Sequence, residues 1–97
     1  MNKRHELHLV SDATGETIHS VARACLSQFD SVESEEHHWS LVRTVNQIDK
    51  VLEGIADSPG VVMFTIVDSE LRVRLQDGCR TLRVPCIPVL DPIMATL

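Results

Sequence analysis

Seven residues in the middle of the chain, 61–67 (VVMFTIV), constrain its fold more than any other feature. They are almost all apolar, and apolar and polar side chains do not alternate along them. A strand with one covered face alternates, whereas a strand buried on both faces is apolar throughout and belongs to a parallel sheet between helices. The run therefore predicts a parallel β-sheet with a helical layer on each face.

Periodicity in the rest of the chain predicts the other elements of such a fold. Besides 61–67, strands are expected at residues 5–10, 32–39 and 84–90. Apolar residues at helical spacing predict a first helix on the stripe Ile18, Val21, Ala22, Cys25, Leu26 and Phe29. The second helix is expected at 44–56, and the third follows an N-cap at Asp68 and carries Leu71, Leu75, Cys79 and Leu82. Asp91-Pro92 could start a fourth helix.

The alternation of strands and helices with short connections indicates right-handed crossovers and a parallel sheet. The polar strand at 32–39 and the strand carrying Pro85 and Pro88 suit the two edges of the sheet. Both facts are satisfied by the strand order 2-1-3-4. We therefore expect residues 1–97 to form a single three-layer α/β domain of the flavodoxin- or Rossmann-like kind, with an open four-stranded parallel sheet.

Composition bears on partners and location. The formal charge is −5, from 9 basic and 14 acidic side chains, which argues against nucleic-acid binding. The sequence contains no run of eighteen apolar residues, so no membrane span is expected. Three widely spaced cysteines, Cys25, Cys79 and Cys86, form no C-x-x-C pair and are expected to be reduced, buried thiols of a cytoplasmic protein.

The candidate site lies at the carboxyl ends of the first and third strands. With this strand order the topological switch point falls there, and open α/β sheets bind ligands at that position. The loop after the first strand is dense in polar groups, and with one residue after the third strand it gives the candidate substrate- or partner-binding residues Ser11, Asp12, Thr14, Gly15, Glu16, Thr17 and Asp68.

Two interpretations of this loop stay open. The loop begins a helix, whose first N–H groups favour an anion such as phosphate, and Gly15 allows close backbone approach. Asp12 and Glu16, however, compete for that positive helix end. The loop either caps the helix through Asp12 or Thr14, or it forms a ligand or partner site.

The other motifs in the sequence do not predict a nucleotide or metal site. No glycine is followed by lysine and a hydroxyl residue, so these residues cannot form a complete P-loop, and no cofactor is expected in them. No metal site is expected, because Glu36 with His38, or Glu35 with His37, would supply only two ligands. Trp39 is interpreted as a core or interface anchor. A solvated helix face is the main interpretation of Arg72, Arg74, Arg80 and Arg83, and contact with an acidic partner is the alternative.

Several segments resemble a known family in order and spacing. They are residues 8–17 (HLVSDATGET), 22–24 (ARA), 28–29 (QF), 36–43 (EHHWSLVR), 59–62 (PGVV), 67–68 with 71–72 (VD and LR), and 84–92 (VPCIPVLDP). The chain thus resembles the N-terminal part of the bacterial pyruvate, phosphate dikinase regulatory proteins, which are related to the phosphoenolpyruvate synthase regulatory proteins. The resemblance covers essentially all 97 residues.

The resemblance implies a bifunctional serine/threonine kinase and pyrophosphorylase. Such proteins inactivate the dikinase by phosphorylating a threonine with ADP, and they reactivate it with inorganic phosphate, releasing pyrophosphate. Their nucleotide site lies beyond the segment that corresponds to residue 97, so the chain alone is expected to be inactive. The alternatives are a non-catalytic docking or homodimerisation module and a flavodoxin-like small-ligand binder.

Overall fold

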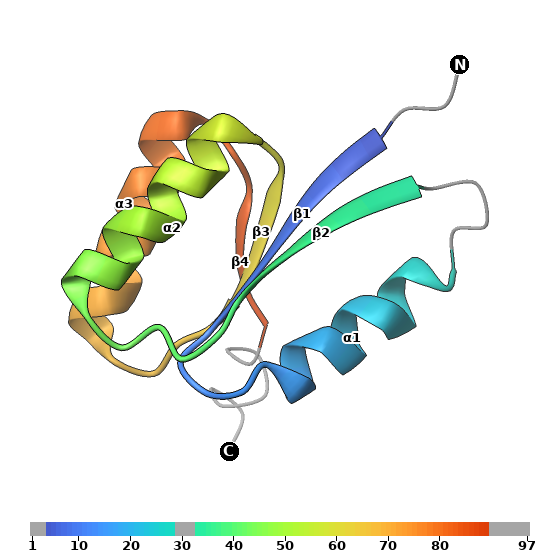
Figure 1. Cartoon of the computed structure of the whole chain (residues 1–97), viewed down its shortest axis with the longest axis horizontal. Coiled ribbons are helices and arrows are strands. Elements are labelled where there is room, and N and C mark those ends of the chain that lie inside the picture. Colours follow the sequence, from blue (N-terminus) through green and yellow to red (C-terminus); the bar gives the residue numbers. More distant parts are fainter. Residues whose placement is uncertain (1–3, 29–32, 90–97) are drawn as a thin grey trace.

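The computed structural model describes residues 4–28 and 33–89. Strands and helices alternate along the chain in the order β1 (Arg4–Ser11), α1 (Glu16–Leu26), β2 (Glu33–Trp39), α2 (Val45–Asp57), β3 (Val61–Thr65), α3 (Ser69–Leu82) and β4 (Cys86–Pro88) (Figure 1). This is the predicted element order. Within the described ranges, no helix combines the length and the apolar character that crossing a membrane requires.

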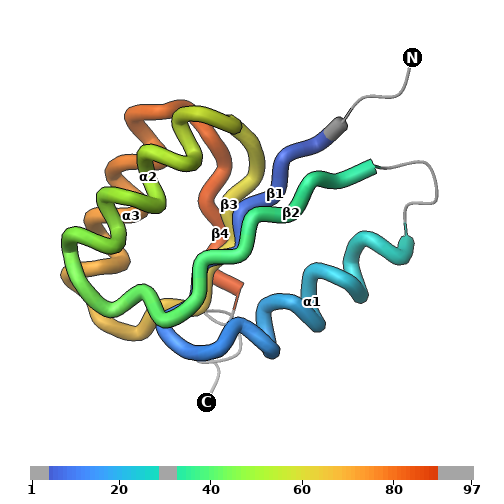
Figure 2. The backbone as a smooth tube through the Cα atoms, viewed as in Figure 1, coloured from blue at the N-terminus to red at the C-terminus, as the bar shows by residue number. Residues whose placement is uncertain are grey.

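The four strands form one parallel sheet in the order β2-β1-β3-β4, which confirms the predicted topology. Helix α1 covers one face of the sheet, and α2 and α3 lie side by side on the other (Figure 2). The predicted three-layer arrangement is therefore confirmed. The polar β2 and the proline-bearing β4 are the two edges, as expected.

Side-chain alternation along β1 divides the interior into two cores. Leu7 and Leu9 face α1 and pack with Ile18 and Ala22. On the opposite face, Val10 joins a larger cluster from β3, α2, α3 and the segments next to them, with Val42, Ile48, Val51, Ile55, Val62, Phe64, Ile66, Leu71, Leu75 and Cys79. Both faces of β1 and β3 are thus covered, which explains why residues 61–64 of β3 are apolar without alternation.

Two strands are shorter than predicted. Strand β3 ends at Thr65 and β4 spans only Cys86–Pro88, whereas the apolar patterns extended to residues 67 and 90. Beyond Thr65 the chain leaves the sheet, and the Val67 side chain is 82% exposed. Phe29 and Leu90, together with the fourth helix expected at Asp91-Pro92, lie outside the described residues.

Helices α2 and α3 approach each other closely at Gly78. A Cβ atom built at this position would lie 2.5 Å from the methyl carbons of Leu52, so a larger residue would require the Leu52 side chain to move. The next residue, Cys79, is hydrogen-bonded through its thiol to Cys86, and this bond is the first cause of a raised pKa at Cys86. Their separation along the chain did not predict this pairing, and Cys25 is exposed, contrary to expectation.

A buried histidine connects three elements on the α2/α3 face of the sheet. His8 of β1 is fully buried; its Nε2 lies 2.8 Å from the Ser58 carbonyl oxygen at the end of α2. The Trp39 indole N–H donates to its Nδ1 at 3.1 Å, and His37 stacks on the ring at 4.5 Å. Only the neutral Nε2–H tautomer satisfies both hydrogen bonds. Burial is the largest cause of the lowered pKa of His8, with the His37 charge adding to it.

This network predicts how stability depends on pH. Because the folded chain holds the pKa of His8 below its ordinary value of 6.5, unfolding takes up a proton at acidic pH. The contribution of His8 is therefore fully present above pH 6.5 and is lost as pH falls below it. Urea unfolding from about pH 7.5 to about pH 5.5 should show a decline with a slope of up to about 1.4 kcal/mol per pH unit from this group.

The variant His8→Gln should show a smaller decline, and at neutral pH it should be about 1–3 kcal/mol less stable because Trp39 loses its acceptor. His5→Gln, at an exposed position on the same strand, is the matched control and should keep the natural pH dependence. Equal slopes in the natural chain and His8→Gln would contradict the neutral, buried histidine.

Candidate functional site

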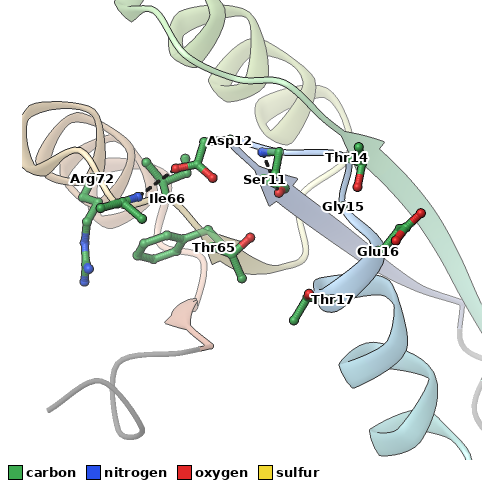
Figure 3. Close-up of a pocket in the computed structure, with 12 residues that line it drawn as sticks. Ser11, Asp12, Thr14, Gly15, Glu16, Thr17, Thr65, Ile66 and Arg72 are labelled. Atoms are coloured by element: carbon green, nitrogen blue, oxygen red, sulfur yellow. Dashed lines mark hydrogen bonds between the residues drawn. The ribbon is translucent and has the colours of Figure 1, made fainter. Parts of the chain in front are cut away.

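A pocket of ≈ 350 Å³ opens where β1 and β3 end. This volume falls in the range of small-molecule sites. Twelve residues line it, namely Ser11, Asp12, Ala13, Thr14, Gly15, Glu16, Thr17, Phe64, Thr65, Ile66, Val67 and Arg72 (Figure 3). The pocket therefore lies at the switch point where the topology predicted a site.

The loop between β1 and α1 is held in place by the segment that follows β2. That segment donates three hydrogen bonds to its backbone carbonyls, from Leu41 N–H to Ala13 at 2.9 Å, from Val42 N–H to Ser11 at 3.0 Å and from the Arg43 Nε–H to Asp12 at 2.8 Å. Within the loop, Ser11 Oγ accepts from the Ala13 N–H at 3.1 Å. The loop is thus braced before any ligand arrives.

Asp12 joins the ends of the two central strands. Its carboxylate Oδ2 accepts a hydrogen bond from the Val67 N–H at 3.0 Å, and its own N–H donates to the Thr65 carbonyl at 3.3 Å. The carboxylate thus holds the chain after β3 against the loop after β1. The prediction that Asp12 caps α1 is wrong, because its carboxylate bonds to a segment 55 residues away.

Gly15 is the N-cap of α1. It adopts the left-handed conformation at φ 89° and ψ 5°, and no side chain caps the helix. The alternative prediction of a Thr14 cap is therefore also wrong. Capping uses the side-chain oxygen of the N-cap residue, and glycine has no side chain to supply one. The uncapped, positive end of α1 borders the pocket.

Arg72 is a pocket residue that sequence reasoning missed. Interpreted as part of a solvated helix face, it is instead half-buried, lines the pocket and lies 5.4 Å from the centre of the Phe64 ring. Arg74 and Arg80 do lie on the surface, where they pair with Asp49 and Asp77. Its position in the sequence could have identified it. Arg72 lies in the first turn of α3, which follows β3 at the same edge of the sheet as the loop.

Six of the seven predicted site residues line the pocket together, and the seventh does not. Asp68 is outside the lining; its Oδ1 accepts from the Leu71 N–H at 3.0 Å, which confirms it as the N-cap of α3. Thr14 and Glu16 lie at one side of the pocket and Arg72 at the other (Figure 3). Binding by any of these residues stays a prediction.

The pocket combines groups suited to a phosphoryl group or a hydroxyl-bearing peptide. Arg72 supplies a positive charge, Thr14 and Thr17 supply hydroxyls, and α1 supplies its N-terminus. Two carboxylates oppose an anion, but Asp12 is already engaged by a backbone N–H and Glu16 is exposed. A small anionic group therefore fits best on the Arg72 side.

The left-handed turn predicts that the stability lost on replacing Gly15 depends on how well the new residue tolerates this conformation. A Cβ there would meet nothing closer than 4.0 Å, so substitution costs backbone strain rather than a clash. Gly15→Ala should lower the unfolding free energy by about 1–2 kcal/mol, and Gly15→Asn by less, since asparagine tolerates this conformation better. Urea unfolding measures both. Equal losses for alanine and asparagine would contradict strain at the turn.

The fold and pocket define an α/β domain with a ligand-sized site at its switch point, and comparison with known proteins gives its family. A sequence model of the family described as Kinase/pyrophosphorylase matches residues 7–97. The chain belongs to this family. The match begins within β1 at residue 7 and covers the loop after it and every later element that the structure describes.

Curated relatives point to one branch. The chain is 56% identical over 95 residues to a protein of Paramagnetospirillum magneticum, covering 98% of the chain and 30% of that relative. It is 50% identical to proteins of Rhodospirillum rubrum and Caulobacter vibrioides, covering 96% and 94% of the chain and 34% and 29% of the relatives. All three are named "Putative pyruvate, phosphate dikinase regulatory protein". The chain spans about a third of their length.

Proposed function

We propose that this chain is the N-terminal domain of a regulatory protein that controls pyruvate, phosphate dikinase by reversible phosphorylation. In this proposal the whole protein phosphorylates a threonine of the dikinase with ADP and so inactivates it. The reverse process uses inorganic phosphate to remove the phosphoryl group and releases pyrophosphate. The family match over residues 7–97 and the names of the relatives support the proposal.

The role proposed for the domain follows from its pocket. The observation that carries it is that one cavity is lined by Arg72, by the Thr14 and Thr17 side chains and by the uncapped start of α1. Phosphoryl transfer depends on positioning and on stabilising negative charge, which a braced loop and an arginine provide. The pocket receives the phosphoryl group or the threonine-bearing segment of the dikinase.

Nucleotide binding is assigned to the remainder of the protein. These 97 residues contain no glycine followed by lysine and a hydroxyl residue, so a P-loop is not among them. The domain forms one wall of the reaction site and contributes neither the nucleotide cradle nor a resident cofactor. The chain by itself is accordingly expected to transfer no phosphate from ADP.

The proposal predicts the effect of removing the charge at Arg72 in the full-length protein. Arg72→Gln should lower both the ADP-dependent kinase rate and the phosphate-dependent dephosphorylation rate at least about tenfold, equivalent to about 1.4 kcal/mol of transition-state stabilisation. Arg72→Lys should restore part of each rate, because it keeps a point charge. Both rates are measured with purified dikinase and its phosphorylated form.

Arg80→Gln is the matched control, because Arg80 pairs with Asp77 on the surface and lies outside the pocket lining. It should leave both rates unchanged. Thermal unfolding of each variant separates a change in the pocket from a loss of folding. Unchanged rates and unchanged dikinase affinity in a folded Arg72→Gln protein would overturn the pocket's role and favour a domain that only docks.

A further inference from the structure

A cluster of metal-ligating side chains lies where α1 meets the edge strand β2, outside the pocket lining. His19 of α1 and Glu36 and His38 of β2 each place one ligand atom within 4.8 Å of the other two. His38 Nε2 lies 3.2 Å from Glu36 Oε1, and His19 Nδ1 lies 3.9 Å from the same oxygen. The two imidazole rings are 5.2 Å apart between centres. Three potential ligands thus converge on one point.

The fold explains how these residues meet. Side chains of a strand alternate between faces, so Glu36 and His38 both point to the α1 face, level with Leu7 and Leu9 of β1. Helix α1 packs on that face and brings His19 over the strand. The expectation of no metal site rested on two ligands sharing a face, and the helix supplies the third.

The ligand types and spacing suit a first-row divalent cation. Two histidines and one carboxylate form a ligand set that zinc enzymes use, with a fourth position left open. Tetrahedral zinc with bonds of about 2.0–2.1 Å separates its ligand atoms by about 3.4 Å. The two separations from Glu36 Oε1, 3.2 and 3.9 Å, approach this value, and all three ligand atoms lie within 4.8 Å of one another. Rotation of the two exposed histidine side chains toward each other would complete the geometry.

The surroundings both orient the carboxylate and leave the cation a path. The Glu36 side chain is only 12% exposed, and its second oxygen is held by Arg23 at 3.1 Å, which leaves Oε1 directed at the histidines. His19 and His38 are 44% and 48% exposed, so a cation and a water molecule can reach them. The Arg23 charge opposes a cation, but its side chain is 62% exposed and can turn into solvent.

We propose that His19, Glu36 and His38 bind one divalent transition-metal ion, with Zn²⁺ as the first candidate and a water molecule as its fourth ligand. The ion takes the place of the proton between His38 and Glu36. It links α1 directly to the sheet edge and therefore stabilises the folded chain.

Titration calorimetry of the tag-free 97-residue chain with ZnCl₂, in a buffer that does not chelate zinc, tests the site. We expect one ion per chain and a melting temperature that rises by roughly 10 °C at about a hundredfold excess over Kd. His38→Gln and the double variant His19→Gln/His38→Gln should weaken binding by at least about tenfold to hundredfold, since even residues that only support a ligand have effects of this size.

Two controls separate this cluster from other zinc ligands. Cys25→Ser removes an exposed thiol on α1, and His5→Gln removes an exposed histidine on β1; neither should change affinity. Co²⁺ bound in place of Zn²⁺ should show no thiolate charge-transfer band. Circular dichroism checks that each variant is folded. No saturable binding by the natural chain, or stoichiometric binding that survives in the folded double variant, would overturn the proposal.

Discussion

The structure depends on the parallel pairing of β1 with a strand on each side. Seven residues of β1 pair with β2 and five pair with β3, so this strand is covered at both edges as well as on both faces. Successive side chains of β1 therefore pack on opposite faces of the sheet. Leu7 and Leu9 face α1, whereas His8 and Val10 face α2 and α3. The hydrogen bonds of His8 to Ser58 and Trp39 hold β1 against α2 and β2, and β1 ends three residues later at Ser11.

The polar pocket lies where β1 and β3 end. Where β1 and β3 end together, backbone groups that no longer pair within the sheet bond to Asp12 and to the segment after β2. The left-handed Gly15 then starts α1 without a side-chain cap. Stable anchoring and an open helix end thus arise from the same loop, which is the kind of prearranged environment that phosphoryl transfer requires.

Features determined by local periodicity were predictable, and features determined by long-range register were not. The apolar 61–67 run and the helical stripes predict the parallel sheet between helices, and the polar strand at 32–39 and the prolines at 85 and 88 predict its edges and so its order. Composition alone could not show that the Asp12 carboxylate reaches Val67 rather than the helix end. The same limit applies to Arg72 in the pocket, to the thiol pair of α3 and β4, and to His19 above Glu36, because each depends on how a helix lies on the sheet.

The central claim is that the pocket between β1 and β3 receives the group that is transferred. A crystal structure of the full-length protein with a phosphothreonine peptide from the dikinase tests this claim most directly. The account predicts that the phosphoryl group or the adjoining peptide lies in contact with Arg72 and Thr14. A peptide bound wholly to residues beyond this domain, with the pocket facing solvent, would contradict it.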